Sequence, residues 1–123
     1  MESQAAVEAL SALASPSRLA AFRLLVRAGP SGLAAGALAR GLAVPPSTLS
    51  THLNLLAHAG LVTSRREGRS ILYAADYEGM RALLGFLMED CCAGAPEICA
   101  PLAEITARAA CCAPQPVLED ETR

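Results

Sequence analysis

Residues 46–74 read PSTLSTHLNLLAHAGLVTSRREGRSILYA, and this stretch decides the fold. Pro46 suits the first turn of a helix, because proline has no amide hydrogen to lose there. The hydrophobic period then changes from helical to alternating, which predicts strands over 61–66 and 70–74. Glu67-Gly68 supplies the turn, since glycine adopts positive φ without strain. The stretch therefore predicts a helix, ended by a glycine, and then a β-hairpin.

Three further helices are predicted on the N-terminal side. Residues 5–14 are rich in alanine and carry larger apolar residues at a spacing of three. Ser15-Pro16 is typical of a helix start, with serine as the cap, and Gly29-Pro30 is typical of its end. A short helix is expected over 33–40, stopping at Gly41.

One more helix is predicted after the hairpin, where Asp76 can act as its cap. Its apolar residues share one face and need a cover: Met80, Leu83, Leu84, Leu87 and Met88. Gly94 and Pro96 end it. We expect one domain over 1–110, with a sensor segment at 90–110, and a disordered tail over 111–123.

Bulk composition bounds the class of protein. A chain of 123 residues fits one small domain, and no run approaches the roughly 20 apolar residues of a membrane span. The N-terminus does not resemble a signal peptide, so we expect a cytoplasmic protein with no membrane partner. Residues 1–75 hold seven arginines and three acidic residues, whereas 76–123 hold three and nine. This split leaves the N-terminal part basic enough to bind DNA.

The predicted elements together form a mainly α-helical fold with a β-hairpin wing, which is a winged helix-turn-helix. On a helical wheel of 47–56 the leucines share one side and the small polar residues the other. Such polar groups can hydrogen-bond base edges in the major groove, and wing arginines can bind the DNA backbone or minor groove. The candidate DNA-binding residues are Ser47, Thr48, Ser50, Thr51, His52, Asn54, Arg65, Arg66 and Arg69.

Four motifs occur in order: ALASPSRL at 12–19, STLSTHL at 47–53, AGLV at 59–62 and RREGR at 65–69. Together they resemble the ArsR/SmtB family of metal-responsive repressors over roughly residues 5–90. The resemblance implies a homodimer formed by the first helix and the helix after the wing. It also implies binding to palindromic double-stranded operator DNA without metal and release with metal. Pro45 departs from the pattern, because a capping serine is common there.

The sensor site of that family varies, so it is assigned from the residues present. The helix over 33–40 holds no cysteine and the helix over 76–90 no histidine, which excludes two familiar sites. Cys91, Cys92 and Cys99 remain. Thiolates select soft ions, and trivalent arsenic takes three of them in a pyramid. We therefore expect trivalent arsenic (arsenite, with antimonite as a variant) as the inducer, as in arsenic-responsive members with an adjacent cysteine pair and a third nearby.

Several alternatives stay open. Zinc or cadmium could bind the same thiolates if Asp90, Glu97 or a tail cysteine gave a fourth ligand. A two-thiol site without Cys99 would suit a methylated trivalent arsenical. A thiol redox sensor would need Cys91 or Cys92 to pair elsewhere, because a disulfide between neighbours is strained. Cys111-Cys112 is expected to have no required role. The chain shows no phosphate loop and no nucleophile–base pair, so we expect no enzyme activity.

Overall fold

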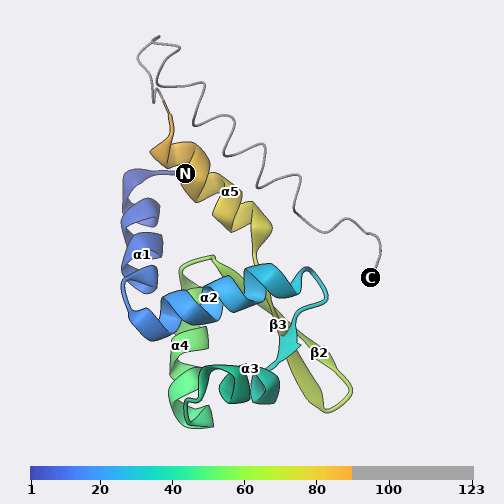
Figure 1. Cartoon of the computed structure of the whole chain (residues 1–123). Helices are drawn as coiled ribbons and strands as arrows, with labels where there is room; N and C mark the ends of the chain where they lie inside the picture. Colours follow the sequence, from blue (N-terminus) through green and yellow to red (C-terminus); the bar gives the residue numbers. More distant parts are fainter. Residues whose placement is uncertain (90–123) are drawn as a thin grey trace. The chain divides into compact units, whose positions relative to one another are not determined.

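The computed structural model describes residues 1–89 of the chain (Figure 1). In order, the elements are α1 (Ser3–Leu13), α2 (Pro16–Ala28), β1 (Leu33–Ala34), α3 (Ala35–Leu42), α4 (Pro46–His58), β2 (Val62–Glu67), β3 (Ser70–Ala75) and α5 (Tyr77–Leu87). Within this range no single helix is long and apolar enough to cross a membrane. By length and composition only the pair α1 and α2 passes, and the chain bends by 100° between them.

The first two helices form as predicted, and their ends have local causes. The Ser15 hydroxyl accepts a hydrogen bond from the Arg18 amide at 3.4 Å, which caps α2 at its start. Gly29 ends α2 with a φ of 87°. The face that α1 buries is made of alanines, whereas Val7 is 57% exposed and Leu10 is 43% exposed. Small residues let α1 pack closely on its neighbours and leave its larger apolar side chains outside.

The prediction of a helix over 33–40 was wrong at both ends. Residues 33 and 34 pair instead with Tyr73 and Leu72 of β3, which makes a third, two-residue strand. At the other end, Gly41 lies inside α3, and the helix continues to Leu42, which packs against the core. Ala43 then ends it in the left-handed conformation, with a φ of 56°. Burial of Leu42 therefore overrode the glycine as a stop signal.

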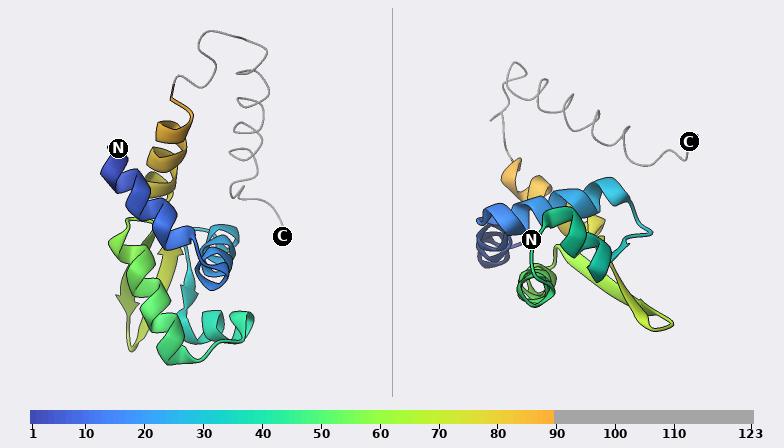
Figure 2. Two further views of the ribbon diagram at one scale, coloured as in Figure 1. Left: turned by 90° about the vertical axis from the view of Figure 1, so that its left-hand side faces the viewer. Right: turned by 60° about the horizontal axis from the view of Figure 1, so that its bottom comes forward.

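The hairpin forms an antiparallel sheet of order β1-β3-β2. Its last pair is Glu67 with Ser70, so the turn is Gly68-Arg69 and not Glu67-Gly68 as the sequence suggested. Gly68 has a φ of 62° and occupies the first turn position, where a tight hairpin turn of type II′ needs a positive value. Figure 2 shows this hairpin extending beyond the helices.

The core lies where the helices meet the base of the sheet. Its largest fully buried side chains are leucines from α2, α3, α4 and the turn after α4: Leu25, Leu38, Leu49, Leu53, Leu56 and Leu61. Each contributes about 1.5–3 kcal/mol by leaving water, so this cluster holds α4 firmly on the rest of the fold. On α5, Leu83 joins the core, while Leu84 and Leu87 are 45% and 51% exposed. Most of the apolar stripe predicted for α5 is thus uncovered in the single chain.

Candidate nucleic-acid interface

The two faces of α4 are sharply divided. Leu49, Leu53 and Leu56 are all at most 1% exposed and fix the rotation of the helix. The predicted DNA-binding residues on the other side are all exposed: Ser47, Thr48, Ser50, Thr51 and Asn54. Their hydroxyl and amide groups can donate and accept hydrogen bonds, which is what reading base edges requires. Burial of the leucines therefore presents the polar row outward.

The start of α4 is open to an anion. Pro45, its N-cap, makes no side-chain hydrogen bond, and Pro46 occupies the first turn. The Thr51 hydroxyl donates to the Ser47 carbonyl at 3.4 Å, so it faces back along the helix and does not cap the amides. The departure at Pro45 thus leaves the first amides without a side-chain partner, where a phosphate can bind them.

His52 lies at the edge of the polar row and is half-buried. Its Nδ1 is 3.5 Å from Nη1 of Arg18, and the Nε of Arg18 donates to the Ala12 carbonyl at 2.6 Å. Because a guanidinium can only donate, His52 accepts this bond. The structure therefore joins His52 to the α1–α2 corner as well as to the predicted row.

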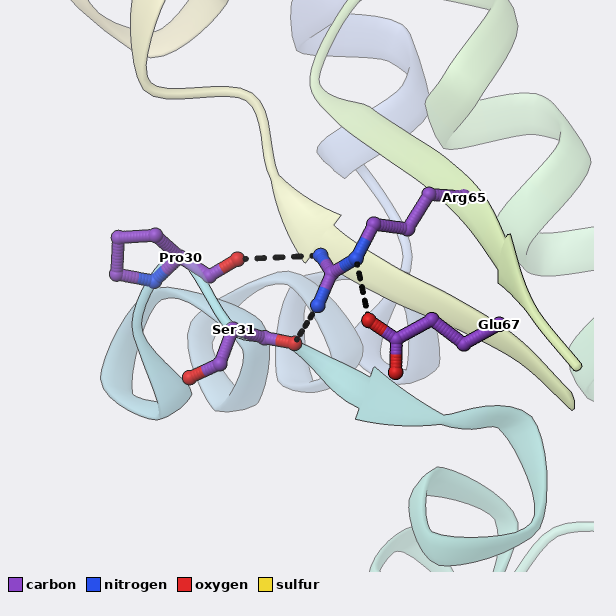
Figure 3. A network of polar contacts seen from close by, with 4 residues as sticks. All are labelled: Pro30, Ser31, Arg65 and Glu67. Carbon is purple, nitrogen blue, oxygen red and sulfur yellow. Dashed lines mark hydrogen bonds and ion pairs between the residues drawn. The ribbon is translucent and has the colours of Figure 1, made fainter.

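The three wing arginines, which the sequence treated alike, are not equivalent. Arg66 and Arg69 are exposed and make no hydrogen bond or ion pair with any residue of 1–89. Arg65 instead bonds to the carbonyls of Pro30 and Ser31 and to Glu67 (Figure 3). Two of the three guanidinium groups are thus available to phosphate, and the third is engaged within the protein.

This arrangement matches known proteins. A family model described as a helix-turn-helix domain matches residues 13–65. The HTH-type transcriptional regulator YgaV of Escherichia coli is 32% identical over 83 residues, which cover 68% of this chain and 82% of YgaV. The chain belongs to the winged helix-turn-helix transcriptional regulators.

Two further comparisons refine the regulator's place. The nodulation protein NolR of Rhizobium meliloti is 36% identical over 80 residues, which cover 65% of this chain and 63% of NolR. The chain therefore spans less than two thirds of that relative's length. A solved structure from Mycobacterium bovis superposes with a TM-score of 0.58 at 29% identity, covering 71% of this chain and 81% of its own. It is described as the homodimeric winged helix-turn-helix DNA-binding domain of a possible ArsR-family regulator. The regulator is thus of the helix-turn-helix, ArsR-like kind.

Two arginines that the sequence analysis did not single out belong to this surface. Arg18 is the partner of His52, and its only sequence signal was its place in the motif at 12–19. Arg40 is exposed in the last turn of α3 and makes no ion pair with residues 1–89. The helix before a recognition helix crosses the DNA backbone in this motif, which makes Arg40 a phosphate-binding candidate.

The predicted metal ligands Cys91, Cys92 and Cys99 lie outside the described residues. Cys111 and Cys112 lie there too. Among residues 1–89, no three histidine, cysteine, aspartate or glutamate side chains gather into a metal site. The sensor site therefore stays a prediction from the sequence.

Proposed function

We propose that the regulator is a repressor that binds palindromic operator DNA as a homodimer and releases it on capturing trivalent arsenic. The carrying observation is that α4 presents a polar row outward beside a wing with two unengaged arginines, Arg66 and Arg69. A recognition helix of this composition suits the major groove, and arginines suit phosphate or a narrow minor groove. α4 would contribute sequence selectivity and the wing most of the salt-dependent affinity.

Dimerisation is supported by apolar side chains that the single chain leaves in water. Val7 and Leu10 on α1 and Leu84 on α5 are 43–57% exposed, with no charged residue among them. Scattered apolar residues are ordinary on a surface, but α1 and α5 are the two helices that the family resemblance assigns to the dimer. Two copies would place two recognition helices about one DNA turn apart, which matches a palindromic site.

The arsenic response is proposed from the sequence of Cys91, Cys92 and Cys99, which follow α5 along the chain. Three thiolates fit a pyramidal soft ion. Because α5 is the proposed dimer helix, an ion bound just beyond it can change how the recognition helices are spaced. A coupling of about 1–3 kcal/mol would lower operator affinity roughly 5- to 150-fold.

The test is DNA binding by the full chain, with a palindromic duplex selected by the wild-type protein from a random-sequence library. Arsenite should release the wild type and a Cys111→Ser control, and Cys91→Ser should stay bound. Equal release of Cys91→Ser and wild type would contradict the site assignment. Release by zinc alone, or by peroxide without arsenite, would favour a zinc sensor or a redox sensor on the same scaffold.

A further inference from the structure

The turn between α2 and β1 is built to lie directly against the sheet. Gly29 and Gly32 have φ values of 87° and 75°, and the Gly32 amide donates to the Gly29 carbonyl at 3.0 Å. A Cβ on Gly32 would overlap the Tyr73 carbonyl oxygen, so only glycine allows the turn to approach β3 so closely. The two central residues, Pro30 and Ser31, are left with carbonyls that no backbone amide uses among residues 1–89.

Arg65 of β2 uses those carbonyls. Its Nη2 donates to the Ser31 carbonyl at 2.9 Å and its Nη1 to the Pro30 carbonyl at 3.4 Å. Its Nε donates to a Glu67 carboxylate oxygen, also at 3.4 Å. Figure 3 shows the guanidinium between the turn and the carboxylate, with each of its three nitrogens engaged. A planar fork with fixed donor directions can serve three acceptors at once, which a lysine ammonium on a flexible stem does less well.

The register shows why this position matters. Arg65 pairs with Leu72, and Leu72 also pairs with Ala34, the last residue of β1. Beyond this row the hairpin is two-stranded, with only the pairs Arg66–Ile71 and Glu67–Ser70 before the turn. A two-stranded hairpin is at best marginally stable on its own. Arg65 therefore ties the hairpin to the helical body at the row where support from the third strand ends.

Successive residues of a strand point to opposite faces of the sheet. Arg65 is directed to the face that meets the Pro30-Ser31 turn, and Arg66 is directed away from it. The two neighbouring arginines thus have different roles although the sequence presents them as a pair. Arg66 is free for a phosphate, and Arg65 is committed to two backbone carbonyls and a carboxylate.

We infer that Arg65 is a positioning residue for DNA binding: it sets the wing relative to the end of α2, and thereby relative to α4, without touching DNA. This inference rests on the proposed DNA-binding function. The link to α4 runs through the core, because Leu25 of α2 and Leu53 of α4 are both fully buried in it. A wing so held meets the DNA backbone in one orientation when α4 enters the major groove.

Two substitutions at each of two neighbouring positions test it. A phosphate contact tolerates Arg→Lys, since a point charge suffices, and Arg→Gln lowers the slope of log affinity against log salt by about 0.9. Arg66→Lys and Arg66→Gln should behave this way. Arg65→Lys should already weaken binding roughly three- to tenfold, the equivalent of one net hydrogen bond, and Arg65→Gln should leave the salt slope unchanged.

Binding is measured by fluorescence anisotropy over a salt series, on the palindromic duplex that the wild-type chain selects. Hydroxyl-radical footprints should lose the flanking protection given by the wing in Arg65→Lys and keep the central protection given by α4. A purely structural role would lower both together. Near wild-type binding by Arg65→Lys, combined with a reduced slope for Arg65→Gln, would overturn the inference and make Arg65 a phosphate contact.

A second measurement does not depend on DNA. Amide hydrogen exchange of the free protein should accelerate in the hairpin of Arg65→Lys and not in that of Arg66→Lys. Unchanged exchange at both positions would also overturn the inference. If the wild-type chain selects no duplex, the proposed function fails, and the exchange experiment alone decides whether Arg65 holds the wing.

Discussion

Gly79 of α5 packs so closely on the Gly60 carbonyl that a Cβ at position 79 would overlap its oxygen. Two hydrogen bonds fix this approach: the Asp76 carboxylate accepts from the Gly79 amide at 3.0 Å, and the Asp76 amide donates to the Leu61 carbonyl at 2.8 Å. Gly60 follows the recognition helix, and α5 leads toward the predicted cysteines. The start of α5 is therefore seated on the turn that ends α4, which gives a short physical route between the sensor side and the DNA-reading side.

Gly79→Ala should destabilise the fold. Forcing a methyl group into a tight contact costs about 1–3 kcal/mol, which outweighs the gain of up to roughly 1 kcal/mol from replacing glycine in a helix. Gly85→Ala on the same helix is the matched control, because a Cβ there has no atom within 4 Å. Urea denaturation should show lower stability for the first variant and equal or higher stability for the second. Equal gains at both positions would contradict the close approach.

Tyr77 should make stability fall at alkaline pH. Its hydroxyl donates to the Val26 carbonyl at 3.0 Å, and burial raises the pKa of this tyrosine above the ordinary 10.0. Below pH 10.0 the hydroxyl is protonated in both states, so its contribution is fully present. Above that value the unfolded chain ionises first, and stability falls until the folded tyrosine ionises as well.

Tyr77→Phe is therefore expected to lose about 0.5–1.5 kcal/mol near neutral pH and to show a weaker alkaline decline. The measurement is the free energy of unfolding in urea across the pH range from about 8 to 11. Tyr73→Phe is the control, since its hydroxyl makes no hydrogen bond within residues 1–89. An alkaline decline that disappears in Tyr73→Phe and persists in Tyr77→Phe would show that the wrong tyrosine had been chosen.

Local signals predicted most of the elements. Pro16, Pro46 and Gly68 act through their own backbone preferences, so α2, α4 and the hairpin could be located from the sequence alone. β1 could not, because Leu33 and Ala34 favour a helix by themselves and become a strand only by pairing with β3. The different role of Arg65 was hidden for the same reason: its acceptors are 34 and 35 residues away along the chain.

The candidate site was predicted unevenly. The polar row of α4 follows from helical periodicity, and the structure presents every predicted member of it except half-buried His52 to solvent. The partner of His52, Arg18, could not be deduced, since it depends on how α2 crosses α4. The arsenic ligands lie beyond residue 89 and stay a prediction from cysteine spacing.

Asn54 should contribute sequence selectivity, and Arg69 should contribute affinity for any sequence. An asparagine amide can bond an adenine edge with both of its polar atoms, and such a pair is worth about 1–3 kcal/mol of discrimination. Asn54→Ala should therefore relax the preference at one base pair in each half-site. Arg69→Gln should weaken binding to all duplexes alike and reduce the salt slope by about 0.9. Affinity measurements on a set of singly substituted duplexes separate the two effects, and identical profiles for both variants would contradict these roles.

The exposed leucines of α1 and α5 provide a test of the dimer. Leu10→Glu or Leu84→Glu would place an unpaired carboxylate in the proposed interface, at a cost of about 3 kcal/mol or more to association. Leu19→Glu is the matched control, because Leu19 is exposed to a similar degree, 44%, but lies on α2. Sedimentation equilibrium should find the first two variants monomeric and the control dimeric. The monomeric variants should also bind a half-site duplex as well as the wild type does, since α4 and the wing are untouched. A Leu10→Glu protein that stays dimeric would exclude α1 from the interface, and one that binds half-sites poorly would show damage to the fold rather than to association.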